Sequence, residues 1–234
     1  MNDKINGFVL SIKDYHDNDV MMQVLTREYG ILSLVGKAAK KLTSKNHFFT
    51  MCLYEFIIDY KDNKTIYTVH GNKLLESFVD DKDLIMMSYK NIFLEAALKN
   101  KEEMPISLYD SLLFVFRNIN DKDKYVLGCM FFSYLIKEHG ITPIVDSCSL
   151  CSEKKVIALS NREGGFLCHR HLGQEEILPV ERLKKFRLII KGTFENFNII
   201  REFDYDRIDL KLVVSFYLEN MGISLRSFDF FLSL

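Results

Sequence analysis

The spacing of apolar residues changes near residue 80, and the part before that point has the pattern of strands and turns. Short apolar runs alternate there with turn sequences at residues 27–30 and 61–64, which is typical of β-strands. We expect five strands, at residues 7–12, 20–26, 31–36, 53–60 and 65–69. Five short strands favour a small closed barrel such as the OB-fold, which recurs among oligonucleotide-binding proteins. SH3-like barrels and half-sandwiches give a similar pattern.

From Asp81 onward, apolar residues recur at the spacing of an α-helix. Three sets indicate three helices: Ile85, Tyr89, Ile92 and Ala96; Leu108, Leu112, Val115 and Ile119; and Leu127, Met130, Phe131 and Tyr134. We therefore expect an α+β protein. An OB-fold nucleic-acid-binding domain is expected at residues 1–79, and an all-helical domain at residues 80–234.

Glycine and proline positions predict where several helices begin and end. Gly140, with Pro143 just beyond it, favours the end of the third helix. Pro179 favours the start of another helix, as its first residue. A last helix is expected from about residue 206 to residue 221, ended by Gly222.

The most specific pattern in the chain combines three cysteines and a histidine at the spacing C-x2-C-x16-C-x2-H. Its members are Cys148, Cys151, Cys168 and His171. Two ligands separated by two residues can bind one ion, and a hairpin can bring two such pairs together, as in structural zinc sites. His169 is a competing fourth ligand, and His171 is preferred because it keeps the gap of two residues. We expect one zinc ion in a module at about residues 146–172.

The segment between the two ligand pairs favours a hairpin. Residues 155–159 and 166–167 have the character of strands, and Gly164 and Gly165 supply the positive φ that such a turn needs. Three thiolates and an imidazole would complete the tetrahedral shell of zinc and leave no position for a catalytic water. The expected role of the metal is therefore structural. The alternative is a set of stray buried thiols.

Composition places the chain among globular proteins. It has 234 residues, 48% of them hydrophobic, and a formal net charge of −1, which argues against a uniformly basic nucleic-acid coat. Three of the five cysteines belong to the metal pattern, which favours a reducing compartment. The first residues carry both charges, and no stretch approaches the roughly 18 apolar residues of a membrane-spanning helix. We expect a cytoplasmic protein that has no membrane partner.

A basic loop is expected after the third strand. Between Glu28 and Glu55 the sequence has no acidic residue, and it has four lysines: Lys37, Lys40, Lys41 and Lys45. Four lysines on four phosphates would give a salt slope of about −3 on single strands. Phe48, Phe49 and Tyr54 follow, where they could stack on bases or belong to the core. The alternative for the lysines is a solvated loop.

A second basic cluster lies on an amphipathic helix after Pro179. Its members are Arg182, Lys184, Lys185, Arg187 and Lys191. Leu183, Phe186 and Ile190 share the apolar face. This cluster could bind phosphate or the acidic tail of a partner. The alternative is again a solvated face.

Three stretches of the chain resemble the RecO family of bacterial recombination mediators, and together they span nearly its whole length. The first comprises residues 7–10, 14–15, 19, 25–30 and 36–38, which are similar to the amino-terminal signature of that family. The second contains Gly140, Pro143, the two cysteines of the first ligand pair, Gly164, Gly165 and Cys168. The third comprises residues 217–218, 222 and 225–227, which are similar to the closing helix and tail of the family.

The resemblance implies an OB-fold domain, a helical domain with a zinc module, and a role in DNA repair and recombination. It implies binding to single- and double-stranded DNA and annealing of complementary strands. It also implies that the protein interacts with RecR and with the tail of the single-stranded DNA-binding protein, and that these interactions help to load the RecA recombinase. Two positions depart from the family. Many zinc-bearing members have cysteine where this chain has His171, and members often have arginine in place of Lys40 and Lys41, which keeps the charge but loses bidentate geometry.

Catalytic signatures are missing from the sequence: it has no G-x4-G-K-[ST] phosphate loop, no H-E-x2-H and no G-x-S-x-G. A zinc deaminase would need H-x-E followed by P-C-x2-C, whereas Ser147 precedes Cys148. We therefore expect a protein without enzymatic activity. Two other classes stay open, namely a zinc-bearing OB-fold transcription or translation factor and a protein-interaction scaffold that binds no nucleic acid.

Overall fold

The structure is a computed structural model that describes residues 3–44, 47–61, 64–79, 83–100 and 105–234. It divides into two compact units. The first, here called the barrel unit, comprises Met1–Arg117 and Leu225–Leu234, and the second, the hairpin unit, comprises Asn118–Ser224. The domain boundary expected between residues 79 and 80 stays a prediction.

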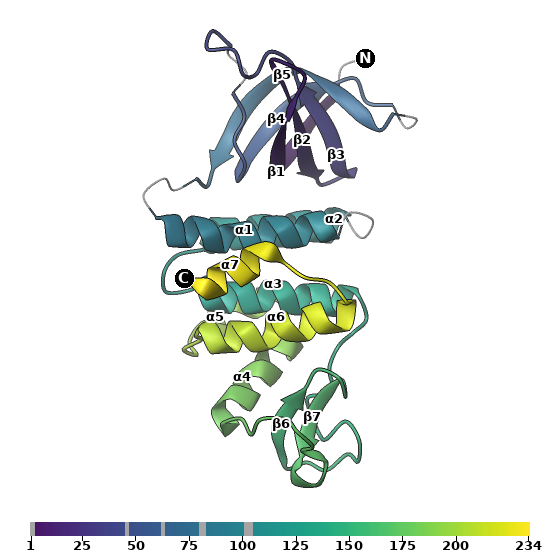
Figure 1. Cartoon of the computed structure of the whole chain (residues 1–234), viewed down its shortest axis with the longest axis vertical. Helices are drawn as coiled ribbons and strands as arrows, with labels where there is room; N and C mark the ends of the chain where they lie inside the picture. The colour runs from purple at the N-terminus through teal and green to yellow at the C-terminus, as the bar shows by residue number, and fades with distance from the viewer. Residues whose placement is uncertain (1–2, 45–46, 62–63, 80–82, 101–104) are drawn as a thin grey trace. The chain divides into compact units, whose positions relative to one another are not determined.

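Five strands form a closed barrel in the barrel unit (Figure 1). They are β1 (Asp3–Tyr15), β2 (Asp19–Thr26), β3 (Gly30–Gly36), β4 (Cys52–Ile58) and β5 (Ile66–Ser77). Their order around the barrel is β1-β2-β3-β5-β4, and β4 pairs with β1 to close it. The β3 and β5 strands are parallel, whereas the other pairs are antiparallel. This five-stranded closed barrel confirms the expected OB-fold class.

Alternating apolar side chains fill the barrel interior. Val20, Met22 and Val24 on β2 are buried in the barrel core, as the period of two in a half-buried strand requires. Phe48, from the loop after β3, also lies in this core. Its ring packs against Gly36, where an added Cβ would lie 2.4 Å from a ring carbon. The lack of a side chain at Gly36 therefore lets the loop fold back onto the barrel.

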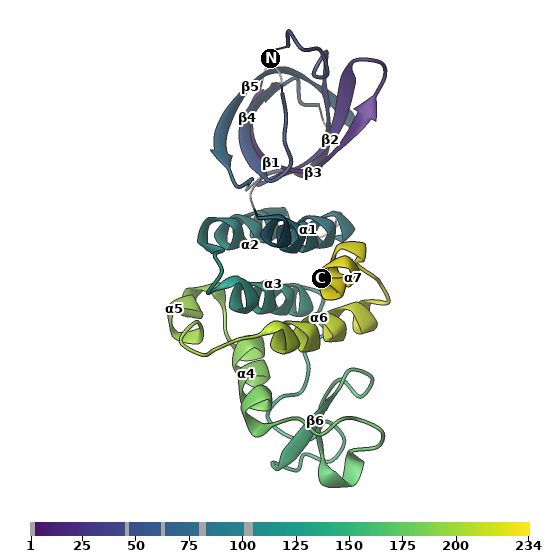
Figure 2. The ribbon, with the colours of Figure 1, turned by 60° about the vertical axis from the view of Figure 1, so that its left-hand side comes forward.

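Three helices complete the barrel unit: α1 (Leu84–Lys99), α2 (Pro105–Asn118) and α7 (Arg226–Ser233). Phe8 on β1 contacts Phe116 of α2, with ring centroids 4.9 Å apart. The α7 helix packs on α1 (Figure 2), where the centroid of Phe231 lies 5.0 Å from that of Tyr89. The resemblance implies a tail at residues 225–227, whereas the structure has the α7 helix beginning at Arg226. The apolar pattern did not predict this helix.

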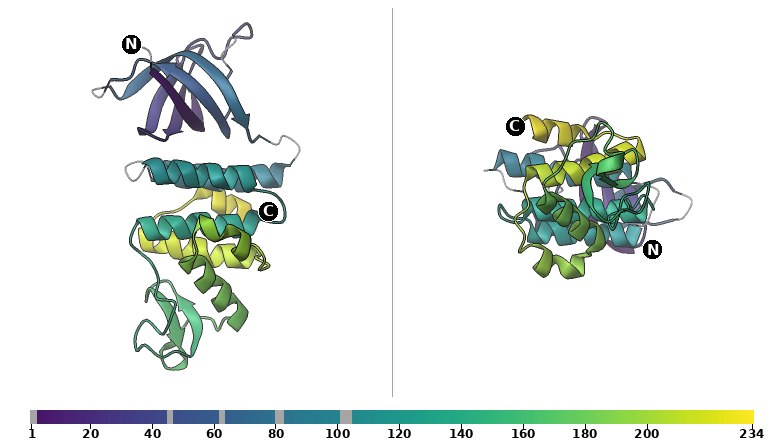
Figure 3. Two further views of the ribbon diagram at one scale, coloured as in Figure 1. Left: turned by 180° about the vertical axis from the view of Figure 1, so that it is seen from behind. Right: turned by 90° about the horizontal axis from the view of Figure 1, so that it is seen from below.

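The hairpin unit contains α3 (Lys124–Glu138), the β6 strand (Val156–Ser160), the β7 strand (Gly165–Cys168), α4 (Val180–Lys191), α5 (Phe197–Ile200) and α6 (Arg207–Met221), with short 3-10 turns at His169–His171 and Phe194–Asn196. The α3 and α6 helices pack side by side (Figure 3). Gly140 and Gly222 have φ of 68° and 63° after α3 and α6, which confirms both predicted helix ends. Pro179 is the N-cap of α4, one residue before the expected position.

Within the ranges that the structure describes, no helix has both the length and the apolar character that crossing a membrane requires.

Candidate functional site

The β6–β7 hairpin brings the four predicted metal ligands together. The Sγ atoms of Cys148 and Cys168 each lie 3.5 Å from Nδ1 of His171. The Sγ atoms of Cys151 and Cys168 are 3.7 Å apart. All four ligand atoms lie within 4.8 Å of one another.

The spacing of these atoms fits a tetrahedral metal site. In zinc sites, bonds of about 2.3 Å to sulfur and about 2.0 Å to nitrogen place two sulfurs about 3.8 Å apart and a sulfur and a nitrogen about 3.5 Å apart. The three separations given above match these edges. The donor set of three thiols and one imidazole is also one that structural zinc sites use.

Backbone turns explain why the cysteine pair can meet one ion. The backbone N–H of Cys148 donates to the carbonyl of Glu153, and the N–H of Ser152 donates to the carbonyl of Cys148. Ser152 has a φ of 62°, in the left-handed region. The 3-10 turn after Cys168 then carries His171 to the cluster, whereas His169 is exposed.

The protein environment favours the metal-binding form of two thiols. Burial raises the pKa of the Cys148 thiol, but hydrogen bonds from the backbone of Cys168 and Leu150 outweigh burial and lower that pKa to about 6. Burial also raises the pKa of Cys168, and contact with Cys151 brings it below its ordinary value. Because the thiolate is the ligand form of cysteine, these shifts suit metal binding.

The hairpin is anchored to the rest of its unit. Gly165 pairs with Ile144, where an added Cβ would lie 2.4 Å from the Ile144 carbonyl oxygen. Phe166 contacts Phe186 of α4, with ring centroids 5.8 Å apart. The predicted strand segments and the glycine turn of the hairpin are confirmed, and the structure shows why Gly165 has to lack a side chain.

The predicted lysine loop lies after β3, next to the β1–β2 turn. The N–H of Lys40 donates to the carbonyl of Asn18, and the N–H of Ala38 donates to Oδ1 of Asp19. Lys37 and Lys41 are exposed. Lys45 lies outside the described residues.

The loop is acid-free in sequence but not in space. The β1–β2 segment brings Asp14 and Asp19 beside it, and Nζ of Lys40 lies 3.3 Å from Oδ2 of Asp14. An ion pair of this kind reduces the charge that a lysine offers to phosphate. Strand pairing brought these acids near, and the linear sequence gave no signal of it.

Two of the three aromatic residues near the loop belong to the core. Phe48 and Tyr54 are buried inside the barrel, whereas Phe49 is 58% exposed. Burial raises the pKa of Tyr54 to about 12, and the Phe49 N–H donates to the Tyr54 hydroxyl. Of the three, only Phe49 can present its ring to a base from this position.

The outer face of β1, β2 and β3 offers further groups that the sequence analysis missed. Strand register places Lys13 beside Met21, and Gln23 beside Ser33. Lys13 is exposed, and the side-chain amide of Gln23 donates to the Ser33 hydroxyl at 2.9 Å. In OB-folds the β2–β3 face is the usual binding surface for nucleic acid. The local sequence gave little signal for Lys13, because the expected first strand ended at Ile12 whereas β1 extends to Tyr15.

Most cations of the basic cluster on α4 form ion pairs with acidic residues from other parts of the hairpin unit, and the expected binding of phosphate or an acidic tail by this cluster stays a prediction. The side chains of Arg187 and Lys191 both pair with Asp146, at 2.5 and 2.6 Å. These two cations hold the pKa of Asp146 below its ordinary value. Lys184 is exposed and has no ion-pair partner among the residues that the structure describes.

The other two cations of the cluster pair with α6 and its cap. Arg182 contacts Asp206 and Asp209 at 2.8 Å each, and Lys185 contacts Asp209 at 3.1 Å. Hydrogen bonding to Arg182 holds the pKa of Asp206 far below its usual range. These pairs join α4 to α6, so their role in the described structure is to hold the two helices together.

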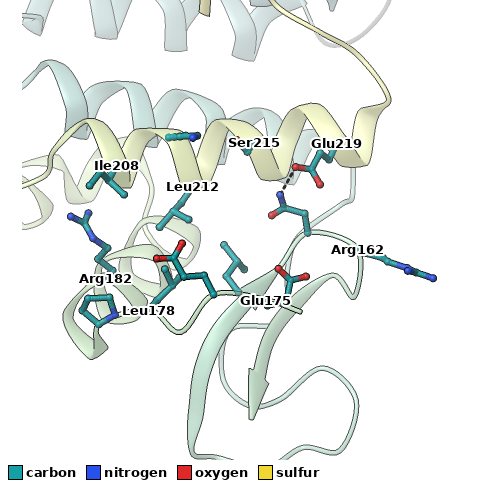
Figure 4. A pocket seen from close by; sticks show the side chains of 13 residues that line it. Arg162, Glu175, Leu178, Arg182, Ile208, Leu212, Ser215 and Glu219 are labelled. Carbon is teal, nitrogen blue, oxygen red and sulfur yellow. Dashed lines mark hydrogen bonds between the residues drawn. The ribbon is translucent and has the colours of Figure 1, made fainter. Parts of the chain in front are cut away.

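A groove of about 530 Å³ lies in the hairpin unit between α6, the hairpin and the start of α4 (Figure 4). Leu178 and Leu212 line its apolar part, and Arg162 and Glu175 lie at its edge. The Asn161 side chain donates to Glu219 across one end. Arg182 belongs to the basic cluster on α4 and also lines this groove, so the two features are adjacent.

Topology and site together define an OB-fold protein with a helical unit that carries a metal-ligand hairpin. Many OB-folds bind oligonucleotides, and exposed lysines lie on this barrel at its β3–β4 loop. Comparison with known proteins shows which family within this class the chain belongs to.

The chain matches the family model described as Recombination protein O N terminal over residues 1–78, and the one described as Recombination protein O C terminal over residues 81–227. It therefore belongs to the Recombination protein O family, whose members act in DNA repair and recombination. Relatives named DNA repair protein RecO occur in Bacillus cereus (strain AH187), Bacillus anthracis and Bacillus cytotoxicus. Each is 25% identical over 236 residues, which cover 96% of this chain and 94% of the relative.

Proposed function

We propose that this protein is a non-catalytic mediator that binds single- and double-stranded DNA, anneals complementary strands and helps to load a recombinase onto protein-coated single strands. The observation that carries the proposal is the closed OB barrel with its exposed lysine loop, in a chain of this family. Annealing needs no covalent bond to form or break. It needs phosphate repulsion to be screened while bases stay accessible.

The lysine loop supplies that screening. Lys37 and Lys41 are exposed and free of the Asp14 ion pair that holds Lys40. Their contacts would go to phosphates, which position a strand without reading its sequence. Lys13 on the adjacent barrel face extends the same surface. A protein that anneals any pair of complementary strands requires this sequence-independent binding.

We also propose that zinc binds the Cys148, Cys151, Cys168 and His171 group. The atom spacing and the lowered thiol pKa values support this metal. When bound, zinc would hold the hairpin closed and would supply no catalytic water, because the four protein ligands fill its tetrahedral shell. This assignment gives the hairpin a structural role.

The proposed partners are RecR and the tail of the single-stranded DNA-binding protein, with RecA acting downstream. Membership of the family supports these partners. An acidic tail would be attracted to Lys184, which is exposed on α4, and opposite charge would steer the encounter. The ion pairs of Arg187 and Lys191 with Asp146 limit what the rest of α4 contributes.

DNA binding measured by fluorescence anisotropy, at several salt concentrations, tests the proposed function. The purified chain should bind labelled oligonucleotides, both single-stranded and double-stranded, with an affinity that does not depend on their sequence, and it should speed the annealing of complementary single strands. Preference for one particular site over unrelated DNA would favour a transcription or translation factor instead. Lack of binding at moderate salt would favour a protein-interaction scaffold.

A further inference from the structure

Three tyrosine rings form a stack at the side of the barrel where β2 turns into β3. The rings of Tyr29 and Tyr60 have centroids 4.1 Å apart and planes 28° apart. The rings of Tyr60 and Tyr67 have centroids 5.3 Å apart and planes 13° apart. The stack joins the β2–β3 turn, the start of the β4–β5 connection and the β5 strand.

Hydrogen bonds fix both ends of the stack. The buried hydroxyl of Thr26 accepts from the N–H of Tyr29 at 3.1 Å and donates to the carbonyl of Gly30 at 2.8 Å. At the other end, the hydroxyl of Tyr67 lies 2.8 Å from the carbonyl oxygens of Lys61 and Lys64. The position of the outermost ring is therefore set before any ligand arrives.

Exposure increases along the stack toward Tyr29. Tyr67 is 3% exposed, and Tyr29 is 40% exposed. Because Tyr60 stacks on one face of the Tyr29 ring, the exposed area of Tyr29 belongs to the rest of that residue. A planar aromatic surface held in this way is what stacking on a nucleobase requires.

The charges around the stack offer little to phosphate. Arg27 is held in an ion pair, and Lys61 and Lys64 share Asp59, at 3.6 and 3.4 Å. Glu28, beside the outermost tyrosine, is exposed. A base is therefore a better match to this surface than a phosphate group.

We propose that Tyr29 is a stacking platform for one base of a single-stranded nucleic acid, with Tyr60 and Tyr67 as its support. This inference rests on the proposed function and adds to it a contact to bases, apart from the phosphate contacts of the lysine loop. The β4–β5 connection of OB-folds is one of the loops that bind oligonucleotides, which agrees with the position of Tyr60. Duplex DNA keeps its bases stacked internally, so the platform favours single strands.

Comparison of a thymidine oligonucleotide with an abasic oligonucleotide of the same length separates base contacts from phosphate contacts. The unsubstituted protein should bind the thymidine strand more tightly than the abasic strand. In Tyr29→Leu, the ratio of the two affinities should fall about 5-fold or more, since stacking contributes at least about that factor per base. The salt slope should stay unchanged, because a base contact releases no counterions. Tyr29→Phe should keep the ratio.

Two further variants control for folding and position. Phe230→Leu removes a ring that is 58% exposed on α7 and should leave the ratio unchanged. The chain contains no tryptophan, so Tyr29→Trp introduces a single fluorescent reporter, whose emission should be quenched by the thymidine strand and not by the abasic one.

The platform would be refuted if folded Tyr29→Leu keeps the parent's ratio of thymidine-strand affinity to abasic-strand affinity. The proposed function would still stand in that case, provided that replacement of Lys37 and Lys41 by Ala makes the salt dependence of DNA binding less steep. Equal quenching of Tyr29→Trp by both strands would also refute it. Lack of DNA binding by the unsubstituted protein would refute both proposals.

Discussion

At the scale of single residues, the fourth metal ligand is decided by the turn that follows Cys168. The 3-10 turn directs His171 to the three thiols and leaves His169 exposed. His171→Ala should therefore lose stoichiometric zinc and lower the thermal stability of the protein, as should Cys168→Ser. His169→Ala should retain zinc, because its ring is outside the cluster.

Metal analysis of the purified variants, together with thermal unfolding with and without a chelator, checks this prediction. His169→Ala is the matched control, since it removes the same side chain two residues earlier. If His171→Ala keeps its zinc and the stability of the parent, the structural assignment of the metal site is wrong.

A second prediction at this scale concerns the ion pair between Lys40 and Asp14. Asp14→Asn removes the partner of Lys40, so single-stranded DNA should bind more tightly. One additional phosphate contact should steepen the salt slope by about 0.7. Replacement of Lys37 and Lys41 by Ala should flatten the slope by about 1.4, which corresponds to two lost phosphate contacts.

Anisotropy titrations across a salt series measure both changes, and Lys122→Ala, an exposed lysine of the hairpin unit, is a control for net charge. A salt slope that is the same in Asp14→Asn, in the double variant and in the parent would remove the lysine loop from the DNA-binding surface.

At the scale of elements, the period of apolar residues predicted the five strands and most helices, because both the barrel interior and the helix faces are set by local alternation. The hairpin was predictable for a related reason, since its ligand spacing and glycines act over short distances. The α7 helix was missed because its eight residues make only about two turns, which is too short for apolar spacing alone to distinguish a helix from a tail, although Phe228 and Phe231 are buried and the helix packs on α1.

The sequence could not show which charges meet in space. Asp146 lies 41 positions before Arg187 and neutralises it only after the unit has folded. Asp14 reaches Lys40 in the same way, through the pairing of β1, β2 and β3. A charged run in sequence therefore gave the positions of the cations, and tertiary structure decided how many of them stay free.

The N-terminus of α6 gives a prediction about stability and pH. Asp206 accepts from the N–H groups of Ile208 and Asp209 and pairs with Arg182. Asp206→Ala should destabilise the protein by about 1–2 kcal/mol, the usual cost of losing a helix cap. Because folding lowers the pKa of Asp206 from 3.8, its contribution is present above about pH 4 and is lost as the pH falls below that value.

Urea unfolding at pH 7 and at pH 3 tests this prediction. The difference in stability between the parent and Asp206→Ala should be largest at pH 7 and smaller at pH 3. Leu212→Met, a conservative change on the same helix, is a control. A difference that grows as the pH falls would contradict the assigned role of the carboxylate.

The α4 helix gives a prediction about partner binding. Asp146→Asn should release Arg187 and Lys191, and the affinity for an acidic, hydrophobic-ended tail peptide should rise. Lys184→Ala should lower that affinity, since Lys184 is exposed and unpaired among the described residues. Isothermal titration with the peptide measures both effects, and equal affinities in all three proteins would exclude α4 as the docking element.

At the scale of the whole molecule, the two units are proposed to have different tasks. The barrel unit carries the lysine loop and the tyrosine stack, which are the surfaces proposed to contact DNA. The hairpin unit carries the metal-ligand cluster and α4, which are proposed to maintain structure and to receive a protein partner. Loss of zinc should therefore affect stability before it affects the contacts of the barrel with DNA.

The proposed mediator function is tested most directly by strand annealing with complementary oligonucleotides that are both coated with single-stranded DNA-binding protein. Annealing should be slow without this chain and clearly faster with it. It should slow again when Lys37 and Lys41 are replaced by Ala. If the folded, zinc-loaded protein leaves the annealing rate of coated strands unchanged, the proposal that it is a mediator of strand annealing is contradicted.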